Sequence, residues 1–345
     1  MGNEAATPST RDGIETGAAL EHGGRLLEAR RRFPQAPAPF LDLSTGINPI
    51  PYPVGDLPPS AWTQLPEPDA LERLQRAAAL AYRVADPAMV VAAPGTQILI
   101  GLLPHFLGHG RAAILGPTYG EHVAAWRNAG ADATEIADFT ARACAPCAVL
   151  CNPNNPDGRR IDPATLLQLA ETLAAVGGTL IVDEAFADFD PALSVAPSLP
   201  HPALIVLRSF GKAYGLAGLR LGFALAAPSR AAQLRAALGP WAVSGPAAAI
   251  GTQALHDSAW RDGAQARLVH DASRLDALLH RASFRPIGGT VLFRLVEHPD
   301  AASICHRLGE AGIVVRRFAA WPTRLRFGLP GAQPSWDRLE NALLT

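Results

Sequence analysis

Short apolar runs alternate with helix-like stretches between about residue 90 and residue 240. Runs of this kind, bounded by Gly, Pro or polar residues, are typical of buried strands. They predict strands at 89–93, 112–115, 148–151, 179–182, 204–208 and 221–226. Helical patterns lie between them, as from 163 to 176, where Asp162 is a candidate N-cap and Pro163 stands at the first helical position. Strands that alternate with helices predict an α/β fold with a large, mostly parallel sheet.

The order of elements changes after Pro240. A long helical stretch to about Arg281 is followed by short strands at 290–295, 313–317 and 324–328, with a helix between the first two. This tail predicts a smaller α+β domain, and a chain of 345 residues is longer than one core usually accommodates. We expect a mobile polar leader at 1–20, an arm at 21–50 that contributes to the small domain, a large domain at 51–240 and a small C-terminal domain at 241–345.

The charges of the chain are balanced, with 30 basic residues, 31 acidic residues and a formal net charge of -1. This balance argues against nucleic acid as the main partner. No apolar run approaches the roughly 20 residues that span a bilayer, and the first 20 residues lack the apolar core of a secretory signal. The sequence therefore predicts a cytoplasmic protein without a membrane partner.

Three of the four cysteines cluster as Cys144, Cys147 and Cys151. A structural zinc site needs four ligands, yet the remaining cysteine, Cys305, is far away in sequence. Cys151 closes an apolar strand-like run, where a thiol serves as a small hydrophobic group. The histidines show no metal-ligand spacing. We therefore expect reduced thiols, histidines that lie on the surface or are satisfied in the core, and no metal.

In open α/β sheets ligands collect beyond the carboxyl ends of the strands, so the residues after each expected strand are candidates for chemistry. Gly95 and Thr96 follow the first strand and open a helix, where they form either a cap or a phosphate site. Asp183 ends the fourth strand, as a helix cap or as the acid that pairs with a protonated ring nitrogen.

A lysine follows the fifth strand on a glycine-containing loop. Lys212 is either a solvated charge or a reactive amine, and its place in the loop favours the amine. Arg220 comes eight residues later, after glycines that permit a close approach of the backbone to a ligand. Ser209 and Arg220 can share one phosphate.

Three segments carry a resemblance: NPNNPDG from Asn152 to Gly158, DEAF from Asp183 to Phe186 and SFGKAYGLAGLR from Ser209 to Arg220. Their order and spacing resemble those of class I/II aminotransferase-like enzymes of fold type I, which use pyridoxal 5'-phosphate (PLP). The resemblance implies the aspartate aminotransferase fold and a homodimer with active sites at the interface. It implies that Lys212 carries PLP, Asp183 meets the pyridine nitrogen, Asn155 meets the ring hydroxyl and Tyr119 stacks on the ring. The phosphate cup would be Gly95, Thr96, Ser209 and Arg220.

Two branches with phosphorylated substrates are most similar, histidinol-phosphate aminotransferase and threonine-phosphate decarboxylase. The opening segments EHGG (21–24) and LSTGINP (43–49), Phe186 in place of Tyr, and the segment RLRFGLPG (324–331) favour the decarboxylase branch. That branch converts L-threonine O-3-phosphate to (R)-1-amino-2-propanol O-2-phosphate in cobalamin biosynthesis. The alternative is histidinol-phosphate aminotransferase or a related amino acid aminotransferase. A PLP-sensing transcription regulator would need an added DNA-binding domain, for which the leader is too short.

Arginines are the expected anchors of a phosphorylated amino acid. By resemblance Arg326 binds the substrate carboxylate and Arg316 the phosphate, while Arg317 and His22 are weaker candidates and Asn48 of the opening segment is a further one. A carboxylate held out of the plane of the PLP ring is lost as CO2, whereas a Cα hydrogen held there gives transamination. The preference for phosphothreonine over phosphoserine stays open, because one methyl group discriminates weakly.

Two positions depart from the pattern of the family. Asp157 replaces the usual Thr of the Asn-Pro-Thr-Gly turn, and Leu65 stands where many relatives carry a Tyr. In those relatives the Tyr reaches the cofactor phosphate of the partner subunit. The sequence therefore predicts the cofactor site but leaves open how the two subunits share it.

Overall fold

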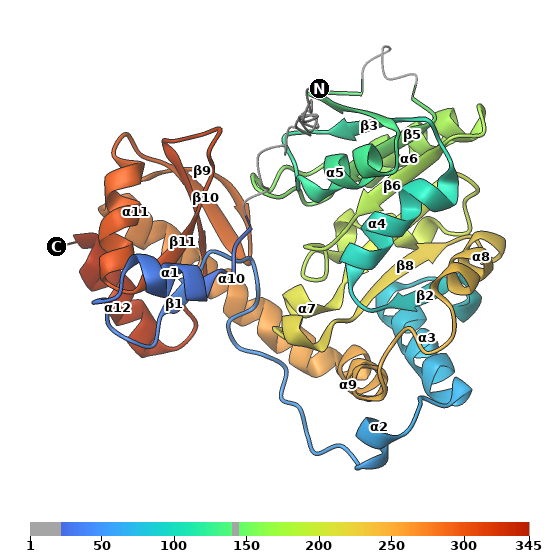
Figure 1. Cartoon of the computed structure of the whole chain (residues 1–345), viewed down its shortest axis with the longest axis horizontal. Coiled ribbons are helices and arrows are strands. Elements are labelled where there is room, and N and C mark those ends of the chain that lie inside the picture. Colours follow the sequence, from blue (N-terminus) through green and yellow to red (C-terminus); the bar gives the residue numbers. More distant parts are fainter. Residues whose placement is uncertain (1–21, 140–144, 345) are drawn as a thin grey trace, which may run out of the picture.

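The computed structural model describes residues 22–139 and 145–344 (Figure 1). The expected leader at 1–20 and Cys144 lie outside the described residues. Two β-sheets organise the chain, a sheet of seven strands and a separate sheet of five. Among the described residues, no helix has the length and apolar character needed to cross a membrane.

The larger sheet has the strand order β2-β8-β7-β6-β5-β3-β4. Its strands are β2 (Val90–Ala93), β3 (Arg111–Leu115), β4 (Asp132–Ile136), β5 (Cys147–Cys151), β6 (Thr179–Asp183), β7 (Leu204–Ser209) and β8 (Gly222–Ala226). The neighbours from β4 to β7 pair in parallel, whereas β8 is antiparallel to both β7 and β2. Every residue of β5, β6 and β8 is buried, as expected for strands covered on both faces. The predicted mostly parallel sheet is confirmed.

Helices cover both faces of this sheet. One apolar cluster joins it to α3 (Pro68–Tyr82) and α6 (Pro163–Ala174). The other joins it to α4 (Thr96–Leu107), α5 (Glu121–Asn128) and α8 (Pro228–Leu238). The predicted cap of α6 is present, because Asp162 Oδ1 accepts a hydrogen bond of 2.9 Å from Thr165 N. Shorter helical turns are α2 (Ser60–Thr63), α7 (Phe210–Ala213), Pro87–Met89, Pro191–Leu193, Ala196–Ser198 and Ala217–Leu219.

The smaller sheet has the order β1-β11-β12-β10-β9. Its strands are β1 (Leu41–Leu43), β9 (Arg285–Thr290), β10 (Phe293–Glu297), β11 (Ile313–Arg317) and β12 (Arg324–Gly328). The remaining helices are α1 (Leu26–Arg32), α9 (Gly245–His256), α10 (Ser258–Arg281), α11 (Ala301–Glu310) and α12 (Gln333–Leu344). Strand β1 pairs in parallel with β11, so the segment before residue 50 completes a sheet built from the C-terminal part of the chain (Figure 1). The domain boundaries at residues 51 and 241 stay predictions.

Three elements differ from the predicted pattern. The long helical stretch after Pro240 is two helices, because Asp257 interrupts it and accepts a hydrogen bond of 2.9 Å from Trp260 N at the start of α10. The single strand predicted at 290–295 is the end of β9 and the start of β10. Strand β4 was not predicted, since it lies at the sheet edge and its exposed Asp132 and Glu135 break the apolar run.

Candidate active site

Lys212 lies in α7, directly beyond the carboxyl end of β7. It is the only lysine among the 30 basic residues of the chain, and its Nζ is 5.8 Å from the ring centroid of Phe186. Burial and the nearby positive charge of Arg326 lower the pKa of Lys212 to about 8, against the opposing effect of Asp183. A substantial fraction of this amine is therefore neutral near physiological pH, the form that attacks a carbonyl carbon.

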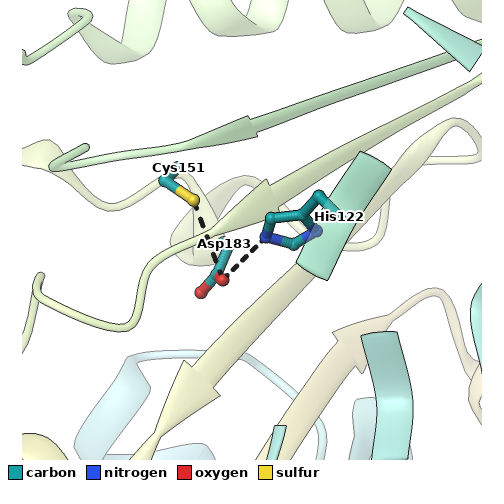
Figure 2. Close-up of side chains that lie close together, drawn as sticks. All are labelled: His122, Cys151 and Asp183. Carbon is teal, nitrogen blue, oxygen red and sulfur yellow. Dashed lines mark hydrogen bonds and ion pairs between the residues drawn. The ribbon is translucent and has the colours of Figure 1, made fainter. Parts of the chain in front are cut away.

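Asp183 ends β6 and is buried with two neighbours (Figure 2). Its Oδ2 lies 3.0 Å from His122 Nε2 and 3.8 Å from Cys151 Sγ, and its Oδ1 accepts a hydrogen bond of 3.1 Å from Ala185 N. Burial acts to lower the pKa of His122, but Cys151 and Asp183 raise it to about 10. At neutral pH His122 is therefore an imidazolium that donates a hydrogen bond from Nε2 to Asp183 Oδ2.

The start of α4 forms an anion cup with an arginine. Gly95 has a φ of +87°, and a Cβ there would lie 2.6 Å from Arg220 Nη2. Only glycine therefore lets the guanidinium approach the first turn of α4. Thr96 and Ser209 line the same cavity. Helix N-terminal N–H groups, two hydroxyls and a guanidinium together match a phosphate.

We define the inner cavity as a space of about 170 Å³ lined by Lys212, Asp183, Cys151, Asn155, Tyr119 and the anion cup. Tyr119 donates a hydrogen bond of 3.1 Å to Gln97 Oε1, and burial together with Glu121 raises the pKa of Tyr119 to about 12. Its phenol is therefore neutral. The donor set fits PLP, since it offers an amine for the aldehyde, an acid for the ring nitrogen, an aromatic ring and a phosphate cup.

The inner cavity continues into the outer cavity, about 530 Å³, and both are lined by Tyr119, Asn155, Phe186 and Lys212. The outer cavity also contains Arg316, Arg326, His22, Glu135, Ser44, Phe318 and Trp321. Its lining thus comes from both sheets.

Two arginines from adjacent strands line the outer cavity. Arg316 of β11 and Arg326 of β12 are register partners in antiparallel strands. Arg326 is buried, and it donates to Asn155 Oδ1 and, over 2.9 Å, to the Ser44 carbonyl oxygen. Both acceptors are neutral, and burial together with Arg316 lowers the pKa of Arg326 to about 9. Like charges in register are unfavourable, so this pair favours an anionic ligand.

Two further candidates differ in position. His22 lines the outer cavity, where its Nε2 lies 2.9 Å from Glu121 Oε1. Asn48 lines neither the inner nor the outer cavity, because its side chain turns toward the lysine segment. Its Nδ2 donates to the Ala213 carbonyl oxygen over 2.9 Å, and its backbone N–H donates to the Lys212 carbonyl oxygen over 2.9 Å. In the described residues Asn48 therefore supports the lysine segment, and its substrate contact stays a prediction.

The two departures from the family pattern have different consequences. Asp157 Oδ1 accepts hydrogen bonds from Asn154 Nδ2 over 2.7 Å and from Arg159 N over 2.9 Å. This carboxylate therefore closes the turn that presents Asn155. Leu65 is exposed and lies outside both cavities of the chain.

Sequence reasoning missed several residues of the site, among them Gln97, Glu121 and the ion-pair role of His122. His122 follows Tyr119 by three positions. This spacing brings the two side chains close only if a helix begins near them, and the start of α5 at Glu121 is known only from the structure. The clearest missed signal was the count of lysines, because a chain with a single lysine has no other amine side chain to offer a cofactor.

The chain matches known proteins over most of its length. The family model described as "Aminotransferase class I and II" matches residues 59–343. The threonine-phosphate decarboxylase of Pseudomonas aeruginosa is 43% identical over 328 residues, which are 94% of this chain and 97% of that protein. A threonine-phosphate decarboxylase of a Sinorhizobium species is 44% identical over 329 residues, which are 94% of this chain and 98% of that protein.

A solved structure shows the same fold. Histidinol-phosphate aminotransferase from Sinorhizobium meliloti, in complex with pyridoxal-5'-phosphate, has a TM-score of 0.76 and 21% identity, over 95% of this chain and 98% of that one. This likeness confirms the predicted PLP-dependent aminotransferase fold. With the family model and the two relatives, it shows that the chain belongs to the class I and II aminotransferase family.

Proposed function

We propose that this protein is a PLP-dependent threonine-phosphate decarboxylase of cobalamin biosynthesis. It converts L-threonine O-3-phosphate to (R)-1-amino-2-propanol O-2-phosphate and releases CO2. The observation that carries the proposal is the pair Arg316 and Arg326, which lie on adjacent strands, line the same cavity as Lys212 and suit a substrate with two anionic ends. Relatives named threonine-phosphate decarboxylase, 43% and 44% identical, support the same reaction.

The inner cavity binds the cofactor. Lys212 Nζ would bind the aldehyde carbon, and Asp183, held by His122, would meet the ring nitrogen. Asn155 would meet the ring hydroxyl, Tyr119 would stack on the ring, and Gly95, Thr96, Ser209 and Arg220 would hold the phosphate. When bound, PLP withdraws electrons from the substrate Cα and so weakens the bonds there.

The outer cavity selects which Cα bond breaks. Arg326 binds the substrate carboxylate and Arg316 the phosphate, so the two ends of the substrate are fixed by adjacent strands of one sheet. With PLP bound, this anchoring would favour cleavage of the Cα–carboxylate bond over the Cα–hydrogen bond. The buried Lys212 amine lies at the junction of the two cavities and can deliver a proton to Cα after CO2 has left.

The alternative is aminotransfer from histidinol phosphate or a related amino acid. Phe186 argues against it, because it stands where the aminotransferase branch carries a phenol. Histidinol phosphate also has no carboxylate, which would leave Arg326 without its anionic ligand.

We further propose that the protein is a cytoplasmic homodimer. Trp62 and Leu65 are apolar yet 69% and 63% exposed, in a segment that leads into α3. Exposed apolar patches mark interfaces, so this segment is the part of the surface that we assign to subunit contact.

Product analysis tests the function. The purified protein with PLP should release CO2 from L-threonine O-3-phosphate without 2-oxoglutarate, and the amine product should keep its phosphate. Formation of glutamate from histidinol phosphate and 2-oxoglutarate, without CO2 release from phosphothreonine, would establish the aminotransferase instead.

A further inference from the structure

Three side chains of different ligand chemistry lie close together (Figure 2), and two of them line the inner cavity. His122, Cys151 and Asp183 each offer one ligand atom, and these atoms all lie within 4.8 Å of one another. All three side chains are buried. The thiol of Cys151 is not explained by the proposed decarboxylation, which uses only the pair of Asp183 and His122.

Regular secondary structure positions the three ligands. Cys151 and Asp183 are register partners at the ends of the parallel strands β5 and β6, so their side chains leave the sheet on the same side. His122 comes from α5. Sites built on strands and helices hold their ligands more precisely than sites on loops.

Two of the three ligand-atom separations bracket those of a tetrahedral zinc site, and the third is at most 4.8 Å. Bonds of about 2.3 Å to sulfur and about 2.0 to 2.2 Å to nitrogen and oxygen separate tetrahedral ligand atoms by roughly 3.3 to 3.6 Å. The observed separations from Asp183 Oδ2 are 3.0 Å to His122 Nε2 and 3.8 Å to Cys151 Sγ. Imidazole nitrogen, thiolate sulfur and carboxylate oxygen are the ligand types that Zn²⁺ takes in proteins.

We propose that His122, Cys151 and Asp183 bind one Zn²⁺ ion when the protein is free of PLP. Cys151 and Asp183 line the inner cavity, so the ion enters from there and keeps a water molecule in its fourth position. Binding releases the thiol proton of Cys151 and the Nε2 proton of His122 to solvent. Two metal bonds then replace the hydrogen bond between His122 and Asp183. No electron transfer is involved.

Zinc and PLP exclude each other at this site. A Zn²⁺ ion on Asp183 neutralises the carboxylate charge that would pair with the protonated ring nitrogen of the cofactor, so the ion and the cofactor compete for Asp183. Free Zn²⁺ therefore inhibits loading of the cofactor, and a cofactor already in place blocks the metal. This exclusion rests on the proposed role of Asp183, whereas metal binding itself does not.

Cobalt(II) is the probe for the metal site, because it occupies tetrahedral zinc sites and gives a thiolate charge-transfer band. The full-length protein, freed of PLP and metals, should bind one Co²⁺ with such a band, and Zn²⁺ should remove the band. Cys151→Ser should abolish it. Cys147→Ser is the matched control and should keep it, since Cys147 lies at the other end of β5 and outside the cluster.

A second variant tests the site independently if Cys151→Ser fails to fold. His122→Gln removes a different ligand and should weaken Co²⁺ binding at least tenfold, with far-ultraviolet circular dichroism unchanged. Absence of the charge-transfer band in the native chain, or its persistence in Cys151→Ser, would overturn the proposal.

Competition between metal ions and PLP tests whether the two exclude each other. Protein loaded with PLP should show no Co²⁺ band, and Zn²⁺ at stoichiometric amounts should slow loading of PLP into the metal-free protein at least tenfold, as followed by cofactor absorbance. Metal binding that is indifferent to PLP would overturn the exclusion and the placement of the cofactor on Asp183. The decarboxylation assay judges the proposed reaction separately.

Discussion

The inner and outer cavities take their charged side chains from different sheets. In the inner cavity Lys212, Arg220 and Asp183 all stand at or beyond strand ends of the larger sheet. The outer cavity gathers Arg316 and Arg326 from the other sheet, in register and with neutral acceptors for Arg326. The inner cavity thus offers an acid for a ring nitrogen beside an anion cup, whereas the arginine pair of the outer cavity suits a substrate with anionic groups.

The two cavities meet where the two sheets touch. The turn at Asp157 and Gly158 packs against Gly288 and Gly289 of β9, and a Cβ on Gly158 or Gly288 would overlap the facing backbone. Asn155 belongs to this turn and lines both cavities. Its contact with Arg326 is therefore a direct link between cofactor and substrate sites.

Removal of Lys212 should have the largest effect. Lys212→Ala should lower CO2 release by about 10³-fold or more, since the only amine side chain of the chain is lost. The fold should persist, because the variant relieves the burial of a charge. Borohydride reduction should fix one PLP per chain on the peptide that contains Lys212 in the native protein, and none there in the variant. A native protein labelled elsewhere, on its terminal amine, would contradict the assignment.

The arginine pair should give the next largest effects. Each of Arg326→Ala and Arg316→Ala should lower kcat/KM for phosphothreonine at least about tenfold, because a charge-assisted hydrogen bond contributes about 1.5 to 3 kcal/mol. Arg326→Ala should also lower kcat, since it misaligns the carboxylate, whereas Arg316→Ala should act mainly on KM.

Arg317 offers the matched control for this pair. It adjoins Arg316 on β11 but is exposed and does not line the outer cavity. Arg317→Ala should therefore keep near-native kinetics. A defect equal to that of Arg316→Ala would mean that general positive charge, rather than the arginine pair, binds the substrate.

The sequence predicted the two cavities unequally. Lys212 and Asp183 were predicted as site residues because each stands at the end of an expected strand of one sheet. A short sequence motif marks each of these positions. The bounds of β11 and β12 were also correct, but a linear pattern does not state that Arg316 and Arg326 are register partners. The contact between His122 and Asp183 depends on how α5 packs on the sheet. No pattern in the sequence specifies that packing.

The pH dependence of cofactor loading tests how the outer cavity acts on the inner one. The pKa of Lys212 is lowered to about 8, so loading should rise about tenfold per pH unit below pH 8 and level off above it. Arg326→Gln removes a neighbouring cation and should move this midpoint to higher pH. Between pH 8 and pH 10.5, the ordinary pKa of lysine, Lys212 binds more protons in the unfolded chain than in the folded one. The contribution of Lys212 to the free energy of unfolding should therefore rise with pH in this range. An unchanged midpoint in Arg326→Gln would show that burial alone sets the pKa.

The smallest effect is expected where the two sheets touch. Asp157→Ala removes an acceptor for Asn154 Nδ2 and Arg159 N, but Asn154 Nδ2 keeps a second acceptor, the Pro117 carbonyl oxygen at 2.9 Å. One hydrogen of Asn154 Nδ2 and the half-buried Arg159 N–H lose this acceptor, so the loss should be about 1 kcal/mol of unfolding free energy. Thermal unfolding should then shift down by about 2 °C, with kcat within about twofold. Asp157→Asn keeps the Oδ1 acceptor and should lie nearer the native value. A large fall in kcat for Asp157→Ala, with Tm unchanged, would instead mean that the Asp157 carboxylate acts on the substrate and that the turn is part of the outer cavity.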